Sequence, residues 1–504
     1  MTDRRAAAAL FVLSFVGYAW FFQGGGFNQN VNLDLARAIA ERGTLSIDAY
    51  HENTGDIAIV GGHVYSNKAP GLSVLAALAW FPVRTGFGAA GIELDEPLSR
   101  TIAAWLTTIL VCGLLGALIP PLIFLHLRAG GTTPKPALGA ALIAAFGTPL
   151  FAYSTMLFAH VPSAALTLAA YHLLFRRSGV TRPLTAGALL GAATTINYLC
   201  GPLLAIFAIG SLLRSRAEPD EQRPRLSWRE PLLFALGSIP PLILLGAYHH
   251  VIFGSPFTTP MDSMNPAFVT EGAWLGIVQG PRIEALWGIT FSPYRGLFFL
   301  SPVLLLAVFG ALEMARRRRR VELGVIVASL AYFVLFNASF NGWHGGYTVG
   351  PRYLLPVVPF LAMMTAPALT RARASVAALG LVSFLFNFAV TAVDPQPPET
   401  LRNPVFQYAI PSLLVGRAAP TSQAPWLADW FTGHTAVNRQ TVDEILPFRR
   451  YPPGSPPTEW ASFNVGELLF PVGSLLSLLP IVVWIAGGSW LLLRRMGGDP
   501  ADAR

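Results

Sequence analysis

Apolar runs of about 20 residues alternate with short arginine-rich joints along nearly the whole chain. A helix of that length crosses the hydrocarbon layer of a membrane, and in lipid only helices or closed barrels satisfy their own backbone hydrogen bonds. The runs predict spans at 6–23, 69–87, 98–126, 135–153, 155–175, 183–197, 199–213, 231–253, 294–315, 321–340, 352–369, 374–393 and 471–492. We therefore expect an all-α integral membrane protein, a polytopic bundle of about 11–13 transmembrane helices.

The basic joints give the bundle a direction. Arginines cluster beside spans at 4–5, 176–177, 214–229, 316–320, 371–373 and 494–495. Such clusters mark cytoplasmic loops, so the long polar segments are expected on the opposite, outer side: 24–68, 254–293, 341–351 and 394–470. Thirteen full spans would place the two chain ends on opposite sides. Either one span between residues 69 and 135 is therefore incomplete, or two short spans elsewhere form one broken helix.

Composition supports the membrane class and removes one alternative. Of the 504 residues, 53% are hydrophobic and 12% are charged, whereas a soluble domain carries roughly 25% charged residues. The net charge of +8 lies in the joints beside the spans, which argues against a nucleic-acid partner. Cys112 and Cys200 lie inside apolar runs, so no disulfide framework is expected.

The polar segments suggest three parts. A transmembrane core covers 1–393 and includes the outer loop 24–68, an outer cap covers 394–470, and 471–504 hold the last helix and a cytoplasmic tail. The apolar stretch after Arg4-Arg5 lacks a small-residue cleavage site, so we interpret it as an uncleaved first span. The expected location is the inner (cytoplasmic) membrane of a bacterium, as a multi-pass protein.

The first outer loop is predicted to contain an interfacial helix. Apolar residues recur at helical spacing through Leu35 and Ile39, and Gly43 suits the end of a helix. Asn32 is the expected N-cap, which would place Asp34 in the first turn, at about the depth of the lipid headgroups.

Three acids in this loop are candidate catalytic groups: Asp34, Asp48 and Asp56. Each also has a structural interpretation, as a helix-end charge or a turn residue. Together with His51 and His63 they could bind a hard metal ion such as Mg²⁺ or Mn²⁺, although no fixed ligand spacing indicates one.

Three cations stand at outer ends of spans, against the charge bias: Lys68, Arg295 and Arg352. A lysine there can extend its ammonium toward water, and an arginine can pair with an acid. The alternative is contact with a phosphate group, for which the guanidinium fork is well suited.

Segment 341–353 is rich in glycine and aromatic residues. Its Trp343, His344 and Tyr347 are candidate substrate-binding residues, because aromatic faces suit a sugar, and His63 of the first loop is a further candidate. They also suit the membrane interface. His160 lies within an apolar run, where it either serves the site or bonds between helices.

Four short motifs resemble the GT-C superfamily of membrane glycosyltransferases, which use polyprenyl-phosphate sugars. They are Leu35-Ala-Arg-Ala-Ile-Ala-Glu-Arg-Gly43, Lys68-Ala-Pro-Gly71, Gly147-Thr-Pro-Leu-Phe-Ala-Tyr-Ser154 and Gly350-Pro-Arg-Tyr-Leu-Leu-Pro-Val-Val-Pro359. The resemblance is nearest to the protein-mannosyltransferase and lipid A aminoarabinose-transferase branch. It covers about the first 370 residues.

The resemblance implies an inverting transfer of a hexose or pentose from a polyprenyl-phosphate donor to a lipid, glycan or protein hydroxyl. A first-loop carboxylate would act as general base, and cations would hold the leaving phosphate. The chain departs from the family at the Asp-Glu pair that usually precedes the interfacial helix. That register falls on Asn28-Gln29, so Asp34, the next acid, is the favoured base, with Asp48 and Asp56 as alternatives.

Two other functions remain open at this stage. A transporter or flippase of envelope precursors should carry buried charges within spans and repeated broken helices, which the sequence does not show. A non-catalytic assembly protein of the cell envelope would explain the missing Asp-Glu pair.

Overall fold

The structure is a computed structural model. It describes residues 1–94, 97–176, 179, 181–217, 228–414, 463–468, 470 and 475–496. The greater part of the predicted cap at 394–470 and the tail beyond Met496 lie outside these residues.

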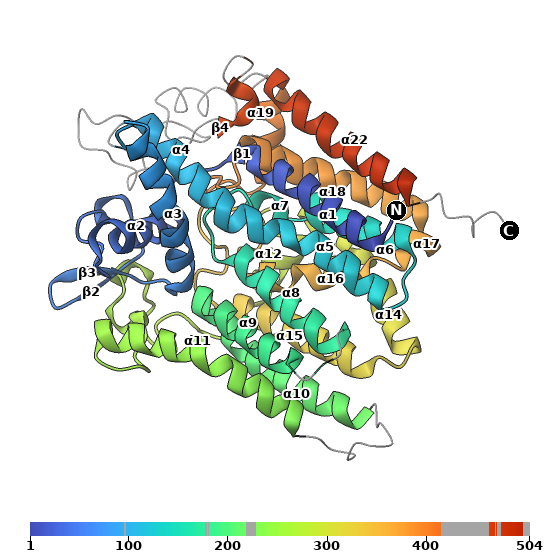
Figure 1. The fold of residues 1–504 in the computed structure, drawn as a ribbon, viewed down its shortest axis with the longest axis horizontal. Helices are drawn as coiled ribbons and strands as arrows, with labels where there is room; N and C mark the ends of the chain where they lie inside the picture. The colour runs from blue at the N-terminus through green and yellow to red at the C-terminus, as the bar shows by residue number, and fades with distance from the viewer. Residues whose placement is uncertain are drawn as a thin grey trace.

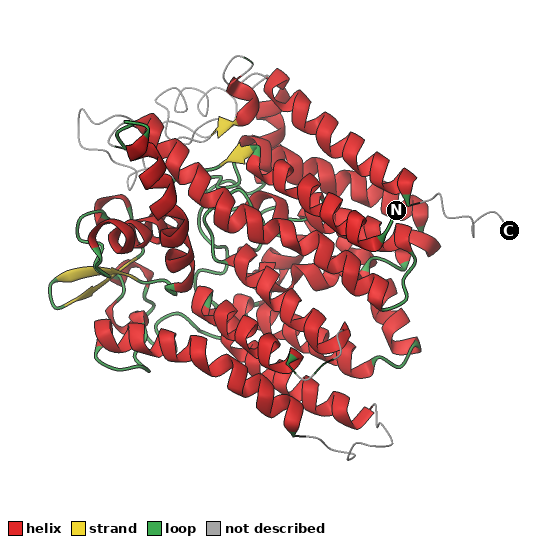
Figure 2. Cartoon of the chain, in the orientation of Figure 1, coloured by secondary structure: helices red, strands yellow, loops and turns green. Residues whose placement is uncertain are grey.

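Helices make up most of the described chain, as Figure 2 shows. The longer ones are α1 (Asp3–Ala19), α2 (Phe27–Arg37), α3 (Gly71–Ala89), α4 (Pro97–Thr108), α5 (Leu114–Ala129), α6 (Pro134–Phe146), α8 (His160–Arg176), α9 (Arg182–Ile196), α10 (Gly201–Ala217), α11 (Arg229–Phe253), α15 (Arg320–Ser339), α18 (Arg373–Val393) and α22 (Leu479–Arg495). The shorter ones are α7 (Leu150–Tyr153), α12 (Ile283–Thr290), α13 (Leu297–Leu300), α14 (Val308–Arg316), α16 (Val358–Met364), α17 (Ala368–Arg371) and α19 (Ile410–Leu414).

Helical turns of other types join these elements. The π-helical segments are Ala38–Arg42, Ile109–Gly113 and Val405–Ala409. The 3₁₀ segments are His51–Asn53, Tyr198–Cys200, Pro260–Ser263, Pro266–Phe268, Pro302–Ala307, Arg352–Val357, Val465–Leu468 and Leu475–Leu478. Two antiparallel strand pairs complete the described elements: β1 (Phe21–Phe22) with β4 (Phe463–Asn464), and β2 (Ile57–Val60) with β3 (His63–Ser66).

The all-α membrane class is confirmed. Within the described residues, 7 helices are long and apolar enough to cross a membrane: Gly71–Ala89, Ser99–Ala129, Arg229–Phe253, Arg320–Ser339, Arg352–Arg371, Arg373–Val393 and Leu475–Arg495. Three further predicted spans, α1, α8 and α10, have 17 residues each. They are slightly shorter than Gly71–Ala89, which with 19 residues is the shortest of the seven.

Some predicted spans are broken helices. The predicted span 294–315 consists of α13, a 3₁₀ segment and α14, with Pro302 at the break. Proline removes a backbone donor and crowds the preceding turn, which ends a regular helix. By contrast, 98–126 is one continuous helical stretch through the π-segment Ile109–Gly113, although Pro120 and Pro121 lie in it.

Small residues bring α9 and α11 into close contact. A Cβ added to Gly187 would lie 1.9 Å from the carbonyl oxygen of Phe234, and one added to Gly237 would lie 1.9 Å from that of Leu184. Such close backbone approach is typical of helix packing in membranes. Farther along α11, Ile243, Leu244 and Val251 are exposed, which suits contact with lipid.

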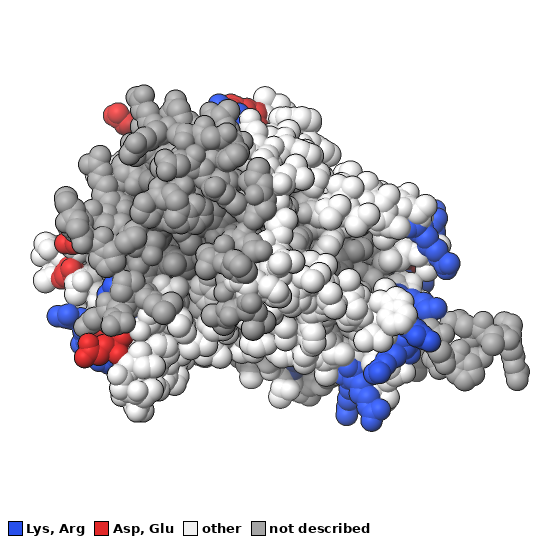
Figure 3. Space-filling view, turned by 90° about the horizontal axis from the view of Figure 1, so that it is seen from above, with Lys and Arg blue, Asp and Glu red and all other residues white. Residues whose placement is uncertain are grey.

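The bundle has two different ends (Figure 1). One carries α2, β2 and β3, and we call it the hairpin end. The other carries the N-terminus, α14 and α17, and we call it the arginine end. Figure 3 shows the largest group of lysine and arginine at one end, while the other end carries acidic residues together with some lysine and arginine. The positive-inside rule makes the arginine end the expected cytoplasmic end.

The first loop differs from its prediction at the start of the helix. Helix α2 begins at Phe27 after Gly26, not after Asn32, and Gly43 ends the helical stretch as expected, with φ of 64°. Asp34 therefore lies in the second half of α2 rather than in its first turn. Because residues 29–36 are buried, α2 is part of the packed structure beside α3.

Candidate active site

A β-hairpin that the sequence analysis did not predict brings Asp56 and Lys68 together. Strands β2 and β3 pair from Ile57 with Ser66 to Val60 with His63. Gly61 and Gly62 form the turn, with φ of 59° and 82°, a backbone conformation that glycine adopts readily and that matches the twist of a hairpin. The residues flanking the two strands are thereby placed side by side.

Asp56 and Lys68 form an ion pair at the base of this hairpin. The Lys68 Nζ lies 2.9 Å from Asp56 Oδ1, and their side chains are 29% and 13% exposed. The Asn67 backbone N–H donates to the Asp56 carbonyl oxygen at 3.2 Å, which fixes the register of the pair. A carboxylate and an ammonium are thus held together at the edge of a cavity.

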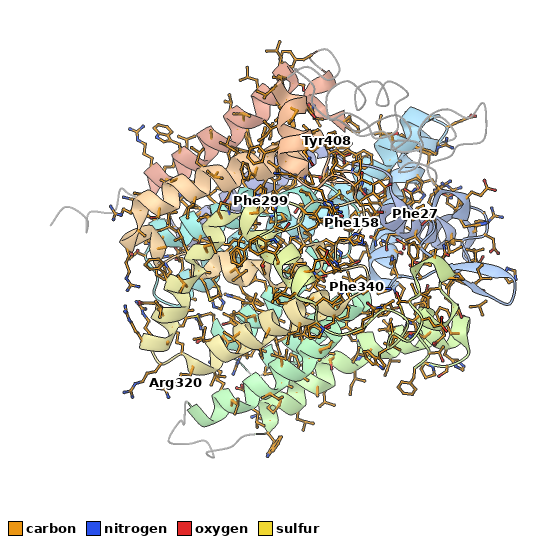
Figure 4. The ribbon with its side chains drawn as sticks, turned by 180° about the vertical axis from the view of Figure 1, so that it is seen from behind. Phe27, Phe158, Phe299, Arg320, Phe340 and Tyr408 are labelled. Carbon is orange, nitrogen blue, oxygen red and sulfur yellow. The ribbon has the colours of Figure 1, made fainter. Side chains whose placement is uncertain are left out.

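The cavity, which we call the hairpin cavity, has a volume of about 490 Å³ and is lined by two kinds of residue, called the apolar wall and the polar wall below for their chemistry only. One wall is apolar: Phe27, Phe158, Met264, Phe268, Val269, Ile277 and Phe340. The other is polar: Asn28, Asn30, Asn53, Asp56, Asn67, Lys68, His344, Tyr347, Arg352, Gln396 and Glu399. Figure 4 shows Phe27, Phe158 and Phe340 near one another and well away from Arg320 at the arginine end.

Arg352 is the second cation of the polar wall. Its guanidinium carbon lies 5.5 Å from the Phe158 ring centroid and 5.0 Å from that of Tyr353, and Nη2 donates to the Tyr353 hydroxyl at 3.0 Å. Its Nε is buried and has no hydrogen-bond partner among the described residues. A buried guanidinium with an unused donor, beside a cavity, favours an anionic ligand.

Amide side chains line the same wall. The Asn30 Nδ2 donates to the Asn53 carbonyl oxygen at 2.7 Å. Within the described part of the chain, the Oδ1 atoms of Asn30 and Asn67 are buried without a hydrogen-bond partner. Buried acceptors of this kind normally have a hydrogen-bond partner, so these two oxygens suit hydrogen bonds from the hydroxyl groups of a sugar.

Asp34, the base favoured from the sequence, does not line the hairpin cavity. It is fully buried, and its Oδ1 accepts a hydrogen bond from Asn53 Nδ2 at 3.3 Å. Asn53 itself lines the cavity, so the Asp34 carboxylate lies behind it.

Asp48 and His63 form a separate, exposed pair on the hairpin. The Asp48 Oδ2 lies 2.8 Å from His63 Nδ1, and Oδ1 accepts from the Val64 backbone N–H at 2.6 Å. Hydrogen bonds from Ser46 and from the Val64 backbone lower the pKa of Asp48 to about 2. Neither residue lines the cavity, and their geometry suits stabilisation of the hairpin.

The segment 341–353 contributes two of its three predicted residues to the cavity. His344 and Tyr347 line it. Trp343 packs against Gly288, where an added Cβ would lie 2.1 Å from the indole ring. The His344 Nδ1 accepts from the Gly346 N–H at 3.1 Å and lies 3.6 Å from a carboxylate oxygen of Glu399. Burial lowers the pKa of His344, and the opposing charge of Glu399 only partly offsets this.

Arg295 holds this segment from behind. It is 1% exposed, and its guanidinium donates to the carbonyl oxygens of His344 at 2.9 Å and Gly346 at 2.8 Å. The predicted phosphate contact remains a prediction, but the observed contacts are those of a residue that positions the His344 loop. His160 is also outside the cavity wall; its Nδ1 lies 3.4 Å from Asn197 Nδ2, a contact between helices.

A metal ion in the cavity stays a prediction. Among the described residues there is no group of three or more His, Cys, Asp or Glu that could hold a metal ion. Of the two carboxylates that line the cavity, Asp56 is paired with the ammonium of Lys68, which would repel a cation, and Glu399 lies near His344.

The sequence analysis did not predict several of the residues that line the hairpin cavity. Phe268 and Val269 belong to the loop between α11 and α12, which Asn341 fastens by donating to the Phe268 carbonyl oxygen at 3.1 Å. Gln396 and Glu399 come from the start of the predicted cap. The sequence analysis placed Gln396 and Glu399 only within this predicted outer cap and did not single out either residue.

No family model matches the chain, and no curated protein matches it. Among similar solved structures, ArnT from Cupriavidus metallidurans bound to undecaprenyl phosphate is 16% identical, with a TM-score of 0.46, and the match covers 99% of this chain and 78% of that one. The Archaeoglobus fulgidus oligosaccharyltransferase in its apo form is 13% identical, with a TM-score of 0.44 and coverage of 98% and 64%. The arabinofuranosyltransferase AftD from Mycobacteria is 17% identical, with a TM-score of 0.41 and coverage of 78% and 27%.

These solved structures are GT-C glycosyltransferases, the superfamily that the sequence motifs resemble. All three likenesses are distant in sequence and in fold. The functional proposal therefore rests on the residues of the hairpin cavity.

Proposed function

We propose that the protein is a membrane glycosyltransferase. It would move a sugar, a hexose or a pentose, from a polyprenyl-phosphate donor to an acceptor hydroxyl at the outer face of the cytoplasmic membrane, with inversion at the anomeric carbon. The acceptor would be a lipid, a glycan or a protein.

One observation carries this proposal: a single cavity combines apolar aromatic residues with polar residues that include two cations, Lys68 and Arg352, and two carboxylates, Asp56 and Glu399. A polyprenyl-phosphate sugar has the same division, with an apolar chain, an anionic phosphate and a polar sugar. The apolar wall suits the first isoprene units. Lys68 and Arg352 suit the phosphate, and the buried acceptors of Asn30 and Asn67 suit the sugar hydroxyls.

Asp56 is the general base in this proposal. The acceptor oxygen forms a bond to the anomeric carbon while its proton passes to the Asp56 carboxylate. The bond from the anomeric carbon to the phosphate oxygen breaks, and the polyprenyl phosphate leaves with the electron pair. Lys68 and Arg352 would stabilise the charge that develops on that phosphate.

The ion pair between Asp56 and Lys68 suits this sequence of events. In the absence of donor, the ammonium neutralises the carboxylate across 2.9 Å. An arriving phosphate would compete with Asp56 for Lys68 and so free the carboxylate to accept a proton. Asp34 and Asp48 do not line the cavity, which is why we prefer Asp56.

A transfer assay tests the proposal. The purified chain in lipid nanodiscs would be incubated with a panel of radiolabelled polyprenyl-phosphate hexoses and pentoses and with a membrane extract that supplies acceptors. We expect release of polyprenyl phosphate and one labelled product with the anomeric configuration opposite to that of the donor. In sealed proteoliposomes, movement of an intact lipid-linked sugar between leaflets without cleavage would instead identify a flippase.

A further inference from the structure

A second cavity lies at the arginine end of the bundle, far from the hairpin cavity. Its volume is about 210 Å³. It is formed where α5 meets α6, beside the end of α8 and the segments around α14 and α17. We call it the arginine pocket; the residues that matter below are His126, Arg176, Glu313, Arg317, Arg319 and Arg371.

The arginine pocket has more cations than anions. Arg317 and Arg371 both pair with Glu313, at 2.5 Å and 2.6 Å. Arg176 pairs with Glu322 at 2.6 Å, and Arg319 donates to the carbonyl oxygen of Gly130 at 2.8 Å. Four arginines thus face two glutamates. Burial lowers the pKa of Arg319, and the neighbouring charge of Arg176 lowers it further.

Two buried nitrogens of this pocket have no hydrogen-bond partner among the residues that the structure describes. They are the Nε of Arg176, whose side chain is 9% exposed, and the Nδ1 of His126, which is 1% exposed. Buried donors are normally satisfied. A vacant guanidinium donor in a pocket with surplus positive charge indicates a site for an anion.

Gly130 lies beside two of these guanidinium groups, those of Arg319 and Arg176. A Cβ added there would lie 3.0 Å from Arg319 Nη1 and 3.1 Å from Arg176 Nε. Its φ is −86°, a value that alanine also adopts, so a methyl group at this position tests the space without straining the backbone.

We propose that the arginine pocket binds a phosphate group at the end of the bundle opposite to the hairpin cavity. Guanidinium groups bind phosphate through charge-assisted hydrogen bonds. The group would belong either to the headgroup of an anionic lipid, since such lipids are abundant at the cytoplasmic leaflet, or to a small soluble phosphate compound. Neither source takes part in sugar transfer, so this proposal is independent of the proposed function.

Two binding measurements on the full chain separate the sources. Native mass spectrometry counts the phosphatidylglycerol molecules retained after extraction from mixed nanodiscs, with phosphatidylcholine as the neutral comparison. Thermal unfolding in detergent compares inorganic phosphate with chloride at equal ionic strength. Retention of phosphatidylglycerol alone identifies a lipid headgroup, and a rise in Tm with inorganic phosphate identifies a soluble ligand; either supports the proposal.

Matched variants locate the binding. Arg319→Gln and Gly130→Ala should weaken binding about tenfold or more. Arg316→Gln removes a nearby exposed charge, and Gly324→Ala adds a methyl group that meets nothing within 4 Å; both should bind within about twofold of the wild type. If Arg319→Gln fails to fold, Gly130→Ala still tests whether the phosphate binds in the arginine pocket. Equal binding by Gly130→Ala and Gly324→Ala, or no preference for either phosphate source over its comparison, would overturn the proposal.

Discussion

Replacing Asp56 by Asn separates the proposed base from the other two acids of the first loop. Asparagine has nearly the same shape as aspartate, but it cannot accept the proton of the acceptor hydroxyl at neutral pH. A positioned general base contributes roughly 10²–10⁴-fold to a rate, which corresponds to about 2.7–5.4 kcal/mol of transition-state stabilisation. We therefore expect kcat to fall by that factor.

The ion pair adds a second expectation, for donor binding and for stability. Without the carboxylate, Lys68 is no longer held by Asp56 and can bind the donor phosphate at least as well, so KM for the donor should stay constant or fall. The two side chains are 13% and 29% exposed, so water compensates part of the lost attraction. We expect the free energy of unfolding to fall by about 1 kcal/mol, rather than by the roughly 3–5 kcal/mol that breaking a fully buried pair costs.

The assay is steady-state transfer from the polyprenyl-phosphate sugar, with thermal unfolding of each variant as the measure of folding. Asp48→Asn is the matched control, because Asp48 lies in the same loop and its pair with His63 is outside the cavity. It should keep kcat within about threefold of the wild type. Asp34→Asn reports on the base favoured from the sequence.

Two results would refute this reasoning. One is an Asp56→Asn variant whose kcat stays within about threefold of the wild type. The other is a folded Asp34→Asn variant that loses transfer while Asp56→Asn keeps it, which would return the role of base to Asp34.

Three further predictions concern the donor phosphate, the cavity wall and the hairpin, and a fourth concerns metals. Arg352→Gln should raise KM or Kd for the donor about tenfold or more, measured by titration with the polyprenyl-phosphate sugar; an unchanged value would remove Arg352 from the phosphate site. Gly26→Ala should lower transfer and Tm, because φ is 90° and the new Cβ would lie 2.5 Å from Gln396 Oε1; wild-type values of both would contradict that packing. The folded state lowers the pKa of Asp48 from its usual 3.8 to about 2. The contribution of the Asp48 carboxylate to the free energy of unfolding is therefore present above pH 3.8 and is lost as the pH falls toward 2. Thermal unfolding of Asp48→Asn should show a deficit under about 1 kcal/mol at pH 7 that shrinks below pH 3.8, and a deficit that grows in acid would be inconsistent with it. Prolonged dialysis against EDTA should leave transfer unchanged, since Lys68 occupies the carboxylate at the cavity edge; a loss restored by Mg²⁺ or Mn²⁺ would contradict this.

The membrane fold and the general position of the site could be predicted from the sequence because both depend on strong, local signals. Long apolar runs predict spans, and cations at the outer ends of spans conflict with the charge bias. Lys68 and Arg352 were selected in this way, and both line the hairpin cavity.

Which of the three acids lines the hairpin cavity could not be predicted, because that depends on contacts that no sequence pattern indicates. Assigning the start of α2 to Asn32 instead of Gly26 placed Asp34 at the wrong point of the helix. The hairpin that brings Asp56 to Lys68 has only four residues in each strand, with a weak alternating pattern. Glu399 reaches the cavity from a segment more than 300 residues away from the first loop, and no periodicity indicates such a contact.

Binding of a polyprenyl phosphate is the measurement that tests the central claim most directly. Native mass spectrometry would compare undecaprenyl phosphate with undecaprenol, which has the same chain and no phosphate, for the wild type and for Arg352→Gln. A site with an apolar wall and two cations should retain the phosphate compound at least about tenfold better than the alcohol, and Arg352→Gln should reduce that preference. Equal retention of the two compounds, unchanged by Arg352→Gln, would contradict a donor-phosphate site in the hairpin cavity.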